Sequence, residues 1–427
     1  MNMSLELTSR DQSILNGDEG QARQFAMDMV VRAARIMSAP HLIDVTFLHV
    51  DACHYYGRAH LDFAQYLVDH HARFDIPAWT NTLVVNLEGP DIRPDADRDF
   101  KDEAYRLPKL YESLGAKPVW TCAPYQLPGG PGFGDQIIGS ESNAVAYYNS
   151  VVGARTNKYG DFLEVCAGLV ARTPFAGLHT DEGRQGTILL DVSEFSDELK
   201  SENLFHHVLG YLVGKLAGSG VPVIKGLLGN TTADQLKAIS AAVAASGGVG
   251  LFHAIGVTPE APDQSTAFHG DHPETEIMVT RDMMVNARDE LSTINDGPLD
   301  MVAVGTPHFS FSEFESLVTL LDGRHIRRGV TFYVTTSRFV RDVAADEGWV
   351  ASLEASGITV VVDTCTYFMP GVKDCQGRVM TNSGKWAYYA PGMLPVEGVV
   401  FGSLRECVES AIIGSVRRDP ALWRALR

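Results

Sequence analysis

The sequence predicts an α/β protein made of several packed domains whose sheets are mainly parallel. Three observations lead to this prediction. The chain has 427 residues, more than one hydrophobic core usually organises, so two or three domains are expected. Apolar runs rich in β-branched residues alternate with helical patterns along almost the whole chain. These helical patterns span about ten to fifteen residues, which is typical of βαβ units and parallel sheets.

Each expected strand is a short apolar run bounded by polar or turn-forming residues. The expected strands are 41–50, 82–86, 118–121, 187–190, 221–224, 249–253, 276–279, 301–304, 331–334, 358–362 and 398–401. The expected helices are 20–37, 59–68, 102–114, 204–216, 232–245, 281–287, 311–321, 338–345 and 404–413. N-cap residues support three of the helix starts, namely Asp18, either Thr231 or Thr232, and Ser310.

Polar and sulfur-bearing side chains follow several of these strands. In parallel α/β sheets, binding sites gather at the carboxyl ends of the strands, so these side chains are expected to share one cleft. They are Asp51, Cys53, Cys122, Lys225, Thr306, His308, Asp363 and Cys365.

Domain boundaries are faint because no long linker or low-complexity tract interrupts the chain. We expect three α/β domains at about residues 1–200, 201–295 and 296–427, packed around one site.

Composition excludes several classes of partner. The net charge of −18 argues against nucleic acid, whose binding needs clustered cations. No apolar run reaches the roughly 18 to 20 residues of a membrane span, so we expect no membrane insertion. The acidic, polar N-terminus is unlike a secretory signal, and the cytoplasm is therefore the expected location.

Familiar short motifs are absent from the sequence. The six cysteines form no C-x-x-C pair, which disfavours zinc ribbons and thioredoxin-like sites. The chain also lacks both the dinucleotide fingerprint and a complete phosphate loop, so a nucleotide-dependent oxidoreductase is disfavoured.

The segment 139–179 is unusually rich in short polar residues beside glycine and arginine. It includes Glu141, Asn143, Arg155, Asn157 and His179. A segment that only had to pack would not need these groups, and it is typical of a site for a small, highly functionalised substrate.

Five motifs occur in a characteristic order: TCAPY (121–125), SNA (142–144), GARTN (153–157), VDTCTY (362–367) and MTNSGKWAYYAPG (380–392). Together they resemble the large subunit of aconitase X, a divergent branch of the aconitase superfamily. The resemblance covers nearly the whole chain and implies an aconitase-like fold.

The resemblance implies a hydro-lyase with an iron–sulfur centre. Family members dehydrate cis-3-hydroxy-L-proline in bacteria or a phosphorylated mevalonate in archaea. The motifs NKYGDFL (157–163) and GKWAYY (384–389) look closer to the bacterial branch. We therefore expect conversion of cis-3-hydroxy-L-proline to a pyrroline-2-carboxylate, with a phosphomevalonate-type dehydratase as the alternative.

Thiolates are the usual ligands of iron–sulfur clusters. Cys122 and Cys365 are the expected ligands in this chain. Related sequences can carry cysteine where this chain has Thr306, a poor iron ligand, so Cys53 is the candidate for the third thiolate. The cluster type stays open between 2Fe-2S and 4Fe-4S, with mononuclear iron as a further alternative.

The remaining site residues are assigned through the resemblance and through their chemistry. A guanidinium or ammonium group can hold the substrate carboxylate, and amides and hydroxyls can hydrogen-bond to the substrate. The expected substrate-binding residues are Asn143, Arg155, Asn157, Asn382 and Ser383. The expected catalytic residues are Glu141, His179 and Lys385.

The resemblance also implies a partner, because aconitase-type sites are completed by a mobile, swivelling small domain. We expect this domain on a separate small subunit, acting with the chain on a small hydroxy acid. A non-catalytic ligand-binding subunit is the competing hypothesis, since the position of Thr306 has lost its thiol.

Overall fold

A computed structural model gives the fold of the chain and describes residues 5–419. The chain divides into two compact units. Unit 1 comprises Met1–Leu83 and Asp97–Gln185, and unit 2 comprises Val84–Ala96 and Gly186–Arg427. The finer division at residues 1–200, 201–295 and 296–427 stays a prediction.

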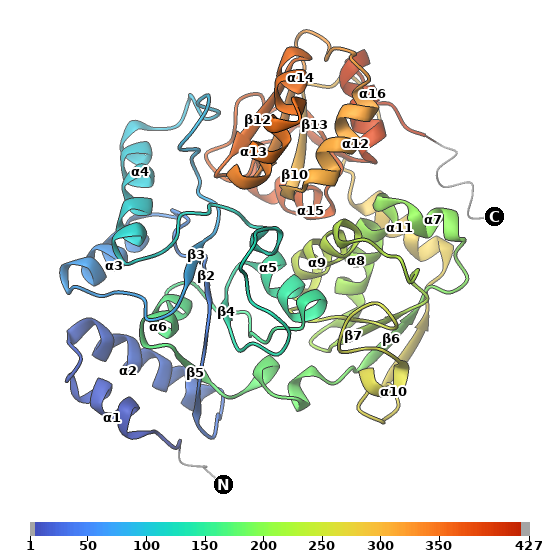
Figure 1. Ribbon diagram of the computed structural model, residues 1–427. Helices are drawn as coiled ribbons and strands as arrows, with labels where there is room; N and C mark the ends of the chain where they lie inside the picture. Colours follow the sequence, from blue (N-terminus) through green and yellow to red (C-terminus); the bar gives the residue numbers. More distant parts are fainter. Residues whose placement is uncertain (1–4, 420–427) are drawn as a thin grey trace. The chain divides into compact units, whose positions relative to one another are not determined.

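Unit 1 contains a three-stranded parallel sheet of order β3-β2-β4 and an antiparallel pair formed by β1 and β5 (Figure 1). Its strands are β1 (Leu42–Asp44), β2 (Leu48–Val50), β3 (Ala78–Thr80), β4 (Ile138–Gly139) and β5 (Arg172–Pro174). Its α-helices are α1 (Ser9–Asn16), α2 (Gln21–Ile36), α3 (Arg58–Asp69), α4 (Arg98–Ser113), α5 (Ser142–Tyr147) and α6 (Leu163–Val170). A π-helical segment follows α5 at Tyr148–Val152, and short 3₁₀ turns lie at Pro124–Gln126, Gly177–His179 and Glu182–Arg184.

The first expected helix, 20–37, is confirmed as α2. Its buried positions recur every three or four residues, as in Ala22, Ala26 and Val30, and form one apolar face. That face packs against α6. The expected N-cap is wrong, because Gly20 holds the cap position and no side chain caps the helix.

Two expected strands of unit 1 are wrong. The strand expected at 82–86 lies earlier, at β3. The segment 118–121 forms no strand, although Lys117 makes a parallel bridge with Trp79 of β3. Pro118 has no N–H to donate, and Trp120 has a φ of 43°, so the chain leaves the extended conformation there. Cys122 therefore follows an irregular segment beside β3.

Unit 2 contains two parallel sheets, of orders β8-β7-β6-β9 and β12-β11-β10-β13-β14. These sheets confirm the prediction of an α/β chain with mainly parallel strands. The strands are β6 (Ile188–Asp191), β7 (Pro222–Lys225), β8 (His253–Ala254), β9 (Thr275–Met278), β10 (Met301–Phe309), β11 (Thr331–Thr336), β12 (Ile358–Val362), β13 (Arg378–Thr381) and β14 (Gly398–Phe401).

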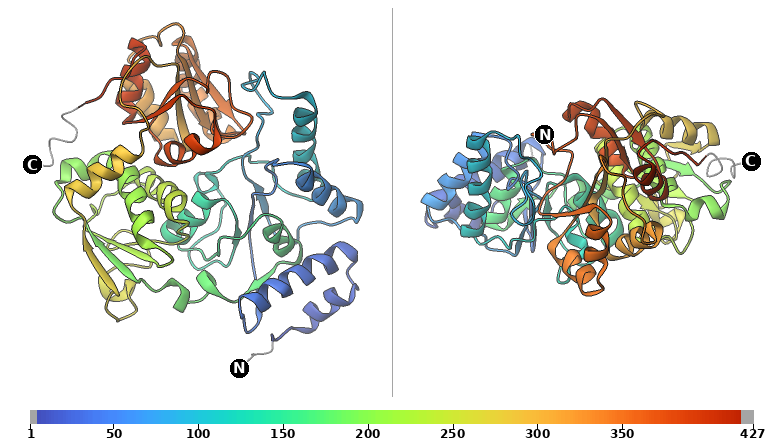
Figure 2. Two further views of the ribbon diagram at one scale, coloured as in Figure 1. Left: turned by 180° about the vertical axis from the view of Figure 1, so that it is seen from behind. Right: turned by 90° about the horizontal axis from the view of Figure 1, so that it is seen from above.

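Helices cover both sheets of unit 2. The core formed by α12, α13, α14 and α16 covers one face of the five-stranded sheet, whereas α15 contacts α8 and α9. Helices α8 and α9 lie side by side in Figure 1 and again from behind in Figure 2. The helices are α7 (Asp197–Ser201), α8 (Asn203–Ala217), α9 (Ala233–Gly247), α10 (Gln264–Ala267), α11 (Arg281–Glu290), α12 (Phe311–Leu321), α13 (Arg338–Asp346), α14 (Trp349–Ala355), α15 (Gly384–Met393) and α16 (Leu404–Ile413).

Capping boxes begin two of these helices where the sequence predicts them. Thr232 accepts a hydrogen bond from Gln235 N at the start of α9, and Ser310 does the same with Glu313 N at the start of α12. Within residues 5–419, no helix combines the length and apolar character that crossing a membrane requires.

Strand β10 is the centre of the five-stranded sheet and is buried along its whole length. It continues beyond the expected end at residue 304 to Phe309, with a break in register against β11 after Val304. Gly305 lies at this break with a φ of 91°, and a Cβ there would lie 2.1 Å from the carbonyl oxygen of Thr335. Only glycine permits so close an approach to β11.

Buried histidines make the stability of unit 2 depend on pH. His206 of α8 is fully buried, and burial lowers its pKa to about 4. The unfolded chain, with an ordinary histidine pKa of about 6.5, binds more protons between these two values. Acidification through this range therefore favours unfolding, whereas below about pH 4 both states are protonated.

On acidification from about pH 7 to about pH 5, the unsubstituted chain should lose unfolding free energy because His206 is buried. We expect this loss to be about 2 kcal/mol smaller in His206→Asn. Denaturant unfolding at the two pH values measures this difference. His272→Asn, at an exposed position, is the control and should keep the pH dependence of the unsubstituted chain. If the unfolding free energy depends on pH equally in H206N and in the unsubstituted chain, His206 is not the source of the pH dependence.

We expect Gly305→Ala to destabilise the chain far more than Gly329→Ala. The two glycines have nearly equal φ values of 91° and 94°, but nothing lies within 4 Å of a Cβ at Gly329. The left-handed conformation should cost about 1–2 kcal/mol in both variants. The close approach should add roughly 1–3 kcal/mol in G305A alone. Thermal or denaturant unfolding measures the difference, and equal stabilities would refute the packing argument.

Candidate metal and substrate site

The carboxyl ends of β10, β12 and β13 carry the candidate site residues of unit 2. His308 lies near the end of β10, Cys365 follows β12 by three residues, and Asn382 and Ser383 follow β13 directly. These strands belong to one parallel sheet, so their carboxyl ends share an edge. The sequence analysis placed His308 and Cys365 at strand ends, but not Asn382 and Ser383, because β13 was not among the expected strands.

His308 and Cys365 form a buried pair of metal-ligating groups. A ring nitrogen of His308 and the sulfur of Cys365 lie within 4.8 Å of each other. The Nε2 atom of His308 lies 3.1 Å from the carbonyl oxygen of Thr364. A histidine that donates one N–H to a carbonyl keeps the other nitrogen available as a ligand, the usual arrangement of metal-bound histidines.

Arg93 brings a cation to this pair, and no pattern in the sequence marks it. Its side chain is 1% exposed and donates hydrogen bonds to the carbonyl oxygens of Cys365 (2.7 Å) and Pro370 (2.8 Å). It also donates to the hydroxyl of Thr364 at 3.4 Å. Burial lowers the pKa of Arg93 to about 10, which leaves the guanidinium charged at neutral pH.

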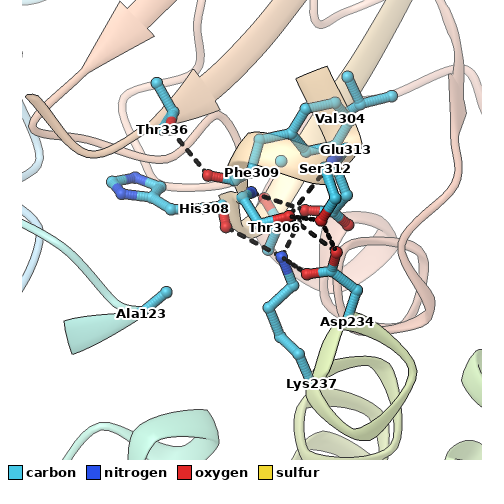
Figure 3. Close-up of polar contacts among 12 residues, drawn as sticks. Ala123, Asp234, Lys237, Val304, Thr306, His308, Phe309, Ser312, Glu313 and Thr336 are labelled. Atoms are coloured by element: carbon cyan, nitrogen blue, oxygen red, sulfur yellow. Dashed lines mark hydrogen bonds and ion pairs between the residues drawn. The ribbon is translucent and has the colours of Figure 1, made fainter. Parts of the chain in front are cut away.

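Lys237 of α9 holds the backbone of His308 (Figure 3). Its ammonium donates to the carbonyl oxygen of His308 at 3.2 Å and pairs with Asp234 and Glu313. Burial alone would lower the pKa of Lys237, but the two carboxylates raise it above its usual value. The imidazole of His308 points away from Lys237, so Lys237 contacts the backbone of His308 and not its ring.

The chemistry of these donors fits a metal. A thiol and an imidazole are common ligands of iron and zinc. The hydroxyl of Thr306 is buried and has no hydrogen-bond partner among residues 5–419. An unsatisfied buried hydroxyl is unusual and fits a nearby bound group that supplies its partner.

Asn382, Ser383 and Lys385 lie at the start of α15. Ser383 caps this helix by accepting a hydrogen bond from Trp386 N at 3.0 Å, and its hydroxyl donates to the carbonyl oxygen of Thr306. Asn382 lines a cavity of about 290 Å³ together with His207. Lys385 is buried in the first turn. The contacts of Ser383 favour a structural role, whereas Asn382 faces a space that a small molecule could fill.

In unit 1, Asn143 holds the backbone of Cys122. The side-chain amide of Asn143 donates to the carbonyl oxygen of Cys122 and to the hydroxyl of Tyr125, each at 2.9 Å. Asn143 is fully buried in α5. The predicted binding residue therefore positions the predicted metal ligand within the same unit.

Cys53, the other candidate ligand of unit 1, lies in an environment that favours the neutral thiol. Its sulfur donates to the carbonyl oxygens of Val50 and Asn81 at 3.3 and 3.5 Å. Burial, together with the nearby carboxylate of Asp51, raises the pKa of Cys53 well above its ordinary value. A thiolate is therefore harder to form at Cys53 than at a cysteine without these neighbours.

Glu141 and His49 lie near the carboxyl ends of β4 and β2. Glu141 is buried and caps α5 by accepting a hydrogen bond from Ala144 N at 2.6 Å. The Nε2 atom of His49 lies 3.0 Å from the carbonyl oxygen of Thr121, and burial lowers the pKa of His49 to about 4. The sequence analysis did not single out His49. Its place in the first expected strand, shortly before Asp51 and Cys53, could have marked it.

The other candidates of unit 1 stabilise the loops of segment 139–179. Arg155 forms an ion pair with Asp181 at 2.6 Å. Asn157 donates to the carbonyl oxygen of Ala176 and accepts from Leu178 N.

His179 has hydrogen-bond partners at both ring nitrogens, Gln136 and Tyr159, each at 2.7 Å. Burial lowers the pKa of His179 to about 3, with smaller contributions from Arg184 and Arg155, so the ring is neutral at pH 7. These contacts favour a structural role for His179.

Comparison with known families and proteins agrees with the resemblance carried by the motifs. The family model described as the first domain of aconitase X matches residues 4–182. The models of the second and third aconitase X domains match residues 186–289 and 299–413.

Two named relatives and one solved structure match almost the whole chain. The chain is 41% identical to a cis-3-hydroxy-L-proline dehydratase of Pseudomonas aeruginosa, over 97% of this chain and 71% of the relative. It is 34% identical to the phosphomevalonate dehydratase large subunit of Methanothermobacter thermautotrophicus, over 92% of this chain and 96% of the relative. The crystal structure of Thermococcus kodakaraensis aconitase X, a holo-form, matches with a TM-score of 0.83 and 29% identity. That match covers 95% of this chain and 100% of the other. The chain belongs to the aconitase X family.

Proposed function

We propose that this protein is a hydro-lyase that dehydrates cis-3-hydroxy-L-proline. The observation that carries the proposal is the 41% identity to a cis-3-hydroxy-L-proline dehydratase over 97% of the chain. A second cis-3-hydroxy-L-proline dehydratase, from Hypocrea jecorina, is 36% identical over the same share of the chain.

The reaction removes one molecule of water from the substrate. The Cα proton and the C3 hydroxyl leave, and the electrons of the Cα–H bond form a double bond between Cα and C3. The resulting enamine tautomerises to a cyclic imine, a pyrroline-2-carboxylate. Hydroxide is a poor leaving group, so the site must stabilise the departing oxygen.

We assign the metal centre of unit 2 to Cys365 and His308, and Cys122 of unit 1 stays a candidate thiolate ligand. The buried pair of His308 and Cys365 supports this assignment, as does the unsatisfied hydroxyl of Thr306. Iron with an open coordination position, once bound, acts as a Lewis acid toward a leaving hydroxyl. His308 takes the place that the sequence analysis gave to Cys53, because the surroundings of Cys53 favour a neutral thiol. An iron–sulfur cluster is the preferred form of the centre, with mononuclear iron as the alternative.

Substrate binding and proton transfer are assigned to the remaining motif residues. Either Arg155 of unit 1 or Lys385 of unit 2 supplies the cation for the substrate carboxylate, and Asn382 supplies an amide at the cavity of unit 2. Glu141 is the preferred proton acceptor, since it is a buried carboxylate that directly precedes the SNA motif. Asn143 acts by holding the backbone of Cys122.

The chain is proposed to act with a small subunit. Several relatives that it matches over more than nine-tenths of their length are named large subunits. In this proposal the small subunit carries the swivelling domain that completes the site.

Dehydration of a phosphorylated mevalonate is the second candidate function. The five phosphomevalonate dehydratase large subunits among the matched relatives are 30–34% identical to the chain. Their lower identity places this reaction behind hydroxyproline dehydration.

We expect Cys365→Ser and His308→Asn each to abolish high-affinity binding of Fe²⁺ by unit 2. Loss of a ligand should weaken binding by more than the roughly 10- to 100-fold that follows loss of a supporting partner. Anaerobic titration with Fe²⁺, without and with added sulfide, and iron and sulfide analysis of the purified chain measure the effect. Cys53→Ser is the matched control and should bind as the unsubstituted chain does. If C53S is the variant that loses iron binding, Cys53 is a metal ligand, as the sequence analysis expected.

We expect the anaerobically purified chain, supplied with iron and its small subunit, to consume cis-3-hydroxy-L-proline and release the cyclic imine. A chelator should abolish turnover and added Fe²⁺ should restore it, because the leaving hydroxyl needs the Lewis acid. Parallel assays with phosphorylated mevalonate test the second function. Turnover of phosphorylated mevalonate alone would replace the first assignment with the second.

A further inference from the structure

Arg93 places a permanent positive charge inside unit 2, beside the residues assigned to the metal centre. Among residues 5–419, the hydrogen bonds of its guanidinium go to the neutral oxygen atoms of Cys365, Pro370 and Thr364. The nearby carboxylate of Asp91 favours the charged form of Arg93. A buried guanidinium needs such hydrogen bonds, because an unsatisfied buried charge is strongly destabilising.

A second buried arginine, Arg172, has acidic partners for its guanidinium. Arg172 of unit 1 is similarly buried and forms ion pairs with Asp11 at 3.0 Å and Asp44 at 2.9 Å. At Arg93 the carboxylate of Asp91 instead accepts a hydrogen bond from the backbone N–H at 2.9 Å. The guanidinium itself donates to the loop that carries Cys365. Its hydrogen bonds therefore hold this loop rather than an acidic side chain.

Arg93 is also linked to His308 through hydrogen bonds to Thr364. Arg93 donates to the hydroxyl of Thr364, and the carbonyl oxygen of Thr364 lies 3.1 Å from Nε2 of His308. The same guanidinium holds the carbonyl oxygen of Cys365 at 2.7 Å. One side chain therefore fixes the loop that carries the thiol ligand and that orients the imidazole ligand.

We propose that Arg93 is a positioning residue of the metal centre, fixing the Thr364–Cys365 loop. The inference rests on the proposed function, because it presupposes metal at Cys365 and His308. Arg93 itself binds neither metal nor substrate. A purely structural arginine would affect unfolding alone, whereas a positioning arginine must also affect metal affinity and the spectrum of the bound metal.

The test compares Fe²⁺ binding by the full chain with that of Arg93→Lys, Arg93→Gln and the matched control Arg172→Lys. Anaerobic titration with Fe²⁺ gives the affinity, thiolate-to-iron absorption reports the ligand set, and thermal unfolding reports the fold. We expect R93Q to weaken Fe²⁺ binding by about 10- to 100-fold and to change the absorption. R93K keeps the charge but not the three-way hydrogen bonding, so its loss should be smaller. R172K should bind Fe²⁺ as the unsubstituted chain does.

Each outcome decides the inference. Unchanged affinity and absorption in a folded R93Q would overturn it. If R93Q does not fold, R93K provides the test instead. An R93K variant that binds Fe²⁺ with the affinity and absorption of the unsubstituted chain would then overturn the inference. If the unsubstituted chain does not bind Fe²⁺, and C365S binds it no more weakly, the proposed metal centre is refuted. The inference about Arg93 is then refuted with it. Loss of affinity in R93Q and R93K, but not in R172K, would support both.

Discussion

Burial of the central strand β10 is the constraint on which the site of unit 2 depends. All nine of its residues are buried, and neighbours pair with it on both sides. Such a strand cannot shift without breaking two parallel ladders, so the residues at its carboxyl end hold fixed positions. Gly305 lets the strand change register beside Thr335, and the chain then presents His308 at the sheet edge.

Cations inside unit 2 secure both candidate ligands by their backbone rather than by their side chains. Lys237 holds the carbonyl oxygen of His308, and Arg93 holds that of Cys365. This arrangement leaves the imidazole and the thiol available for a metal while limiting the motion of both. In unit 1, Asn143 holds the carbonyl oxygen of Cys122 in the same way. A site built from loops thus gains the rigidity that its chemistry needs.

The two buried cations differ in how their charge is balanced. Lys237 lies between the carboxylates of Asp234 and Glu313, so its charge is neutralised within the protein. Burial raises the pKa of Glu313 to about 7, whereas the pKa of Asp234 lies below its usual value, so Asp234 is the partner that stays charged through neutral pH. The guanidinium of Arg93 instead donates to neutral oxygen atoms of the loop at Thr364 and Cys365, and the carboxylate of Asp91 accepts from its backbone N–H.

The sequence by itself determined the fold class, most elements of unit 2 and the family. Local patterns suffice there, because a fully buried parallel strand is a continuous apolar run and a capping box such as that of Thr232 spans four residues. The sequence also marked Cys122, Cys365 and Asn143 through motifs. It misplaced the strand before Cys122, since the effect of Pro118 and Trp120 on the backbone outweighs an apolar pattern.

Only the tertiary structure decided how the candidate ligands are supported. Arg93 and Cys365 are 272 positions apart, and nothing in the neighbourhood of Arg93 distinguishes it from a surface arginine. Likewise, the carbonyl partners of Cys53 and the two partners of His179 lie on other segments and give these residues a structural character. Periodicity and motifs encode short-range structure, whereas the pairing of a buried charge depends on contacts between distant segments, which exist only once the chain has folded.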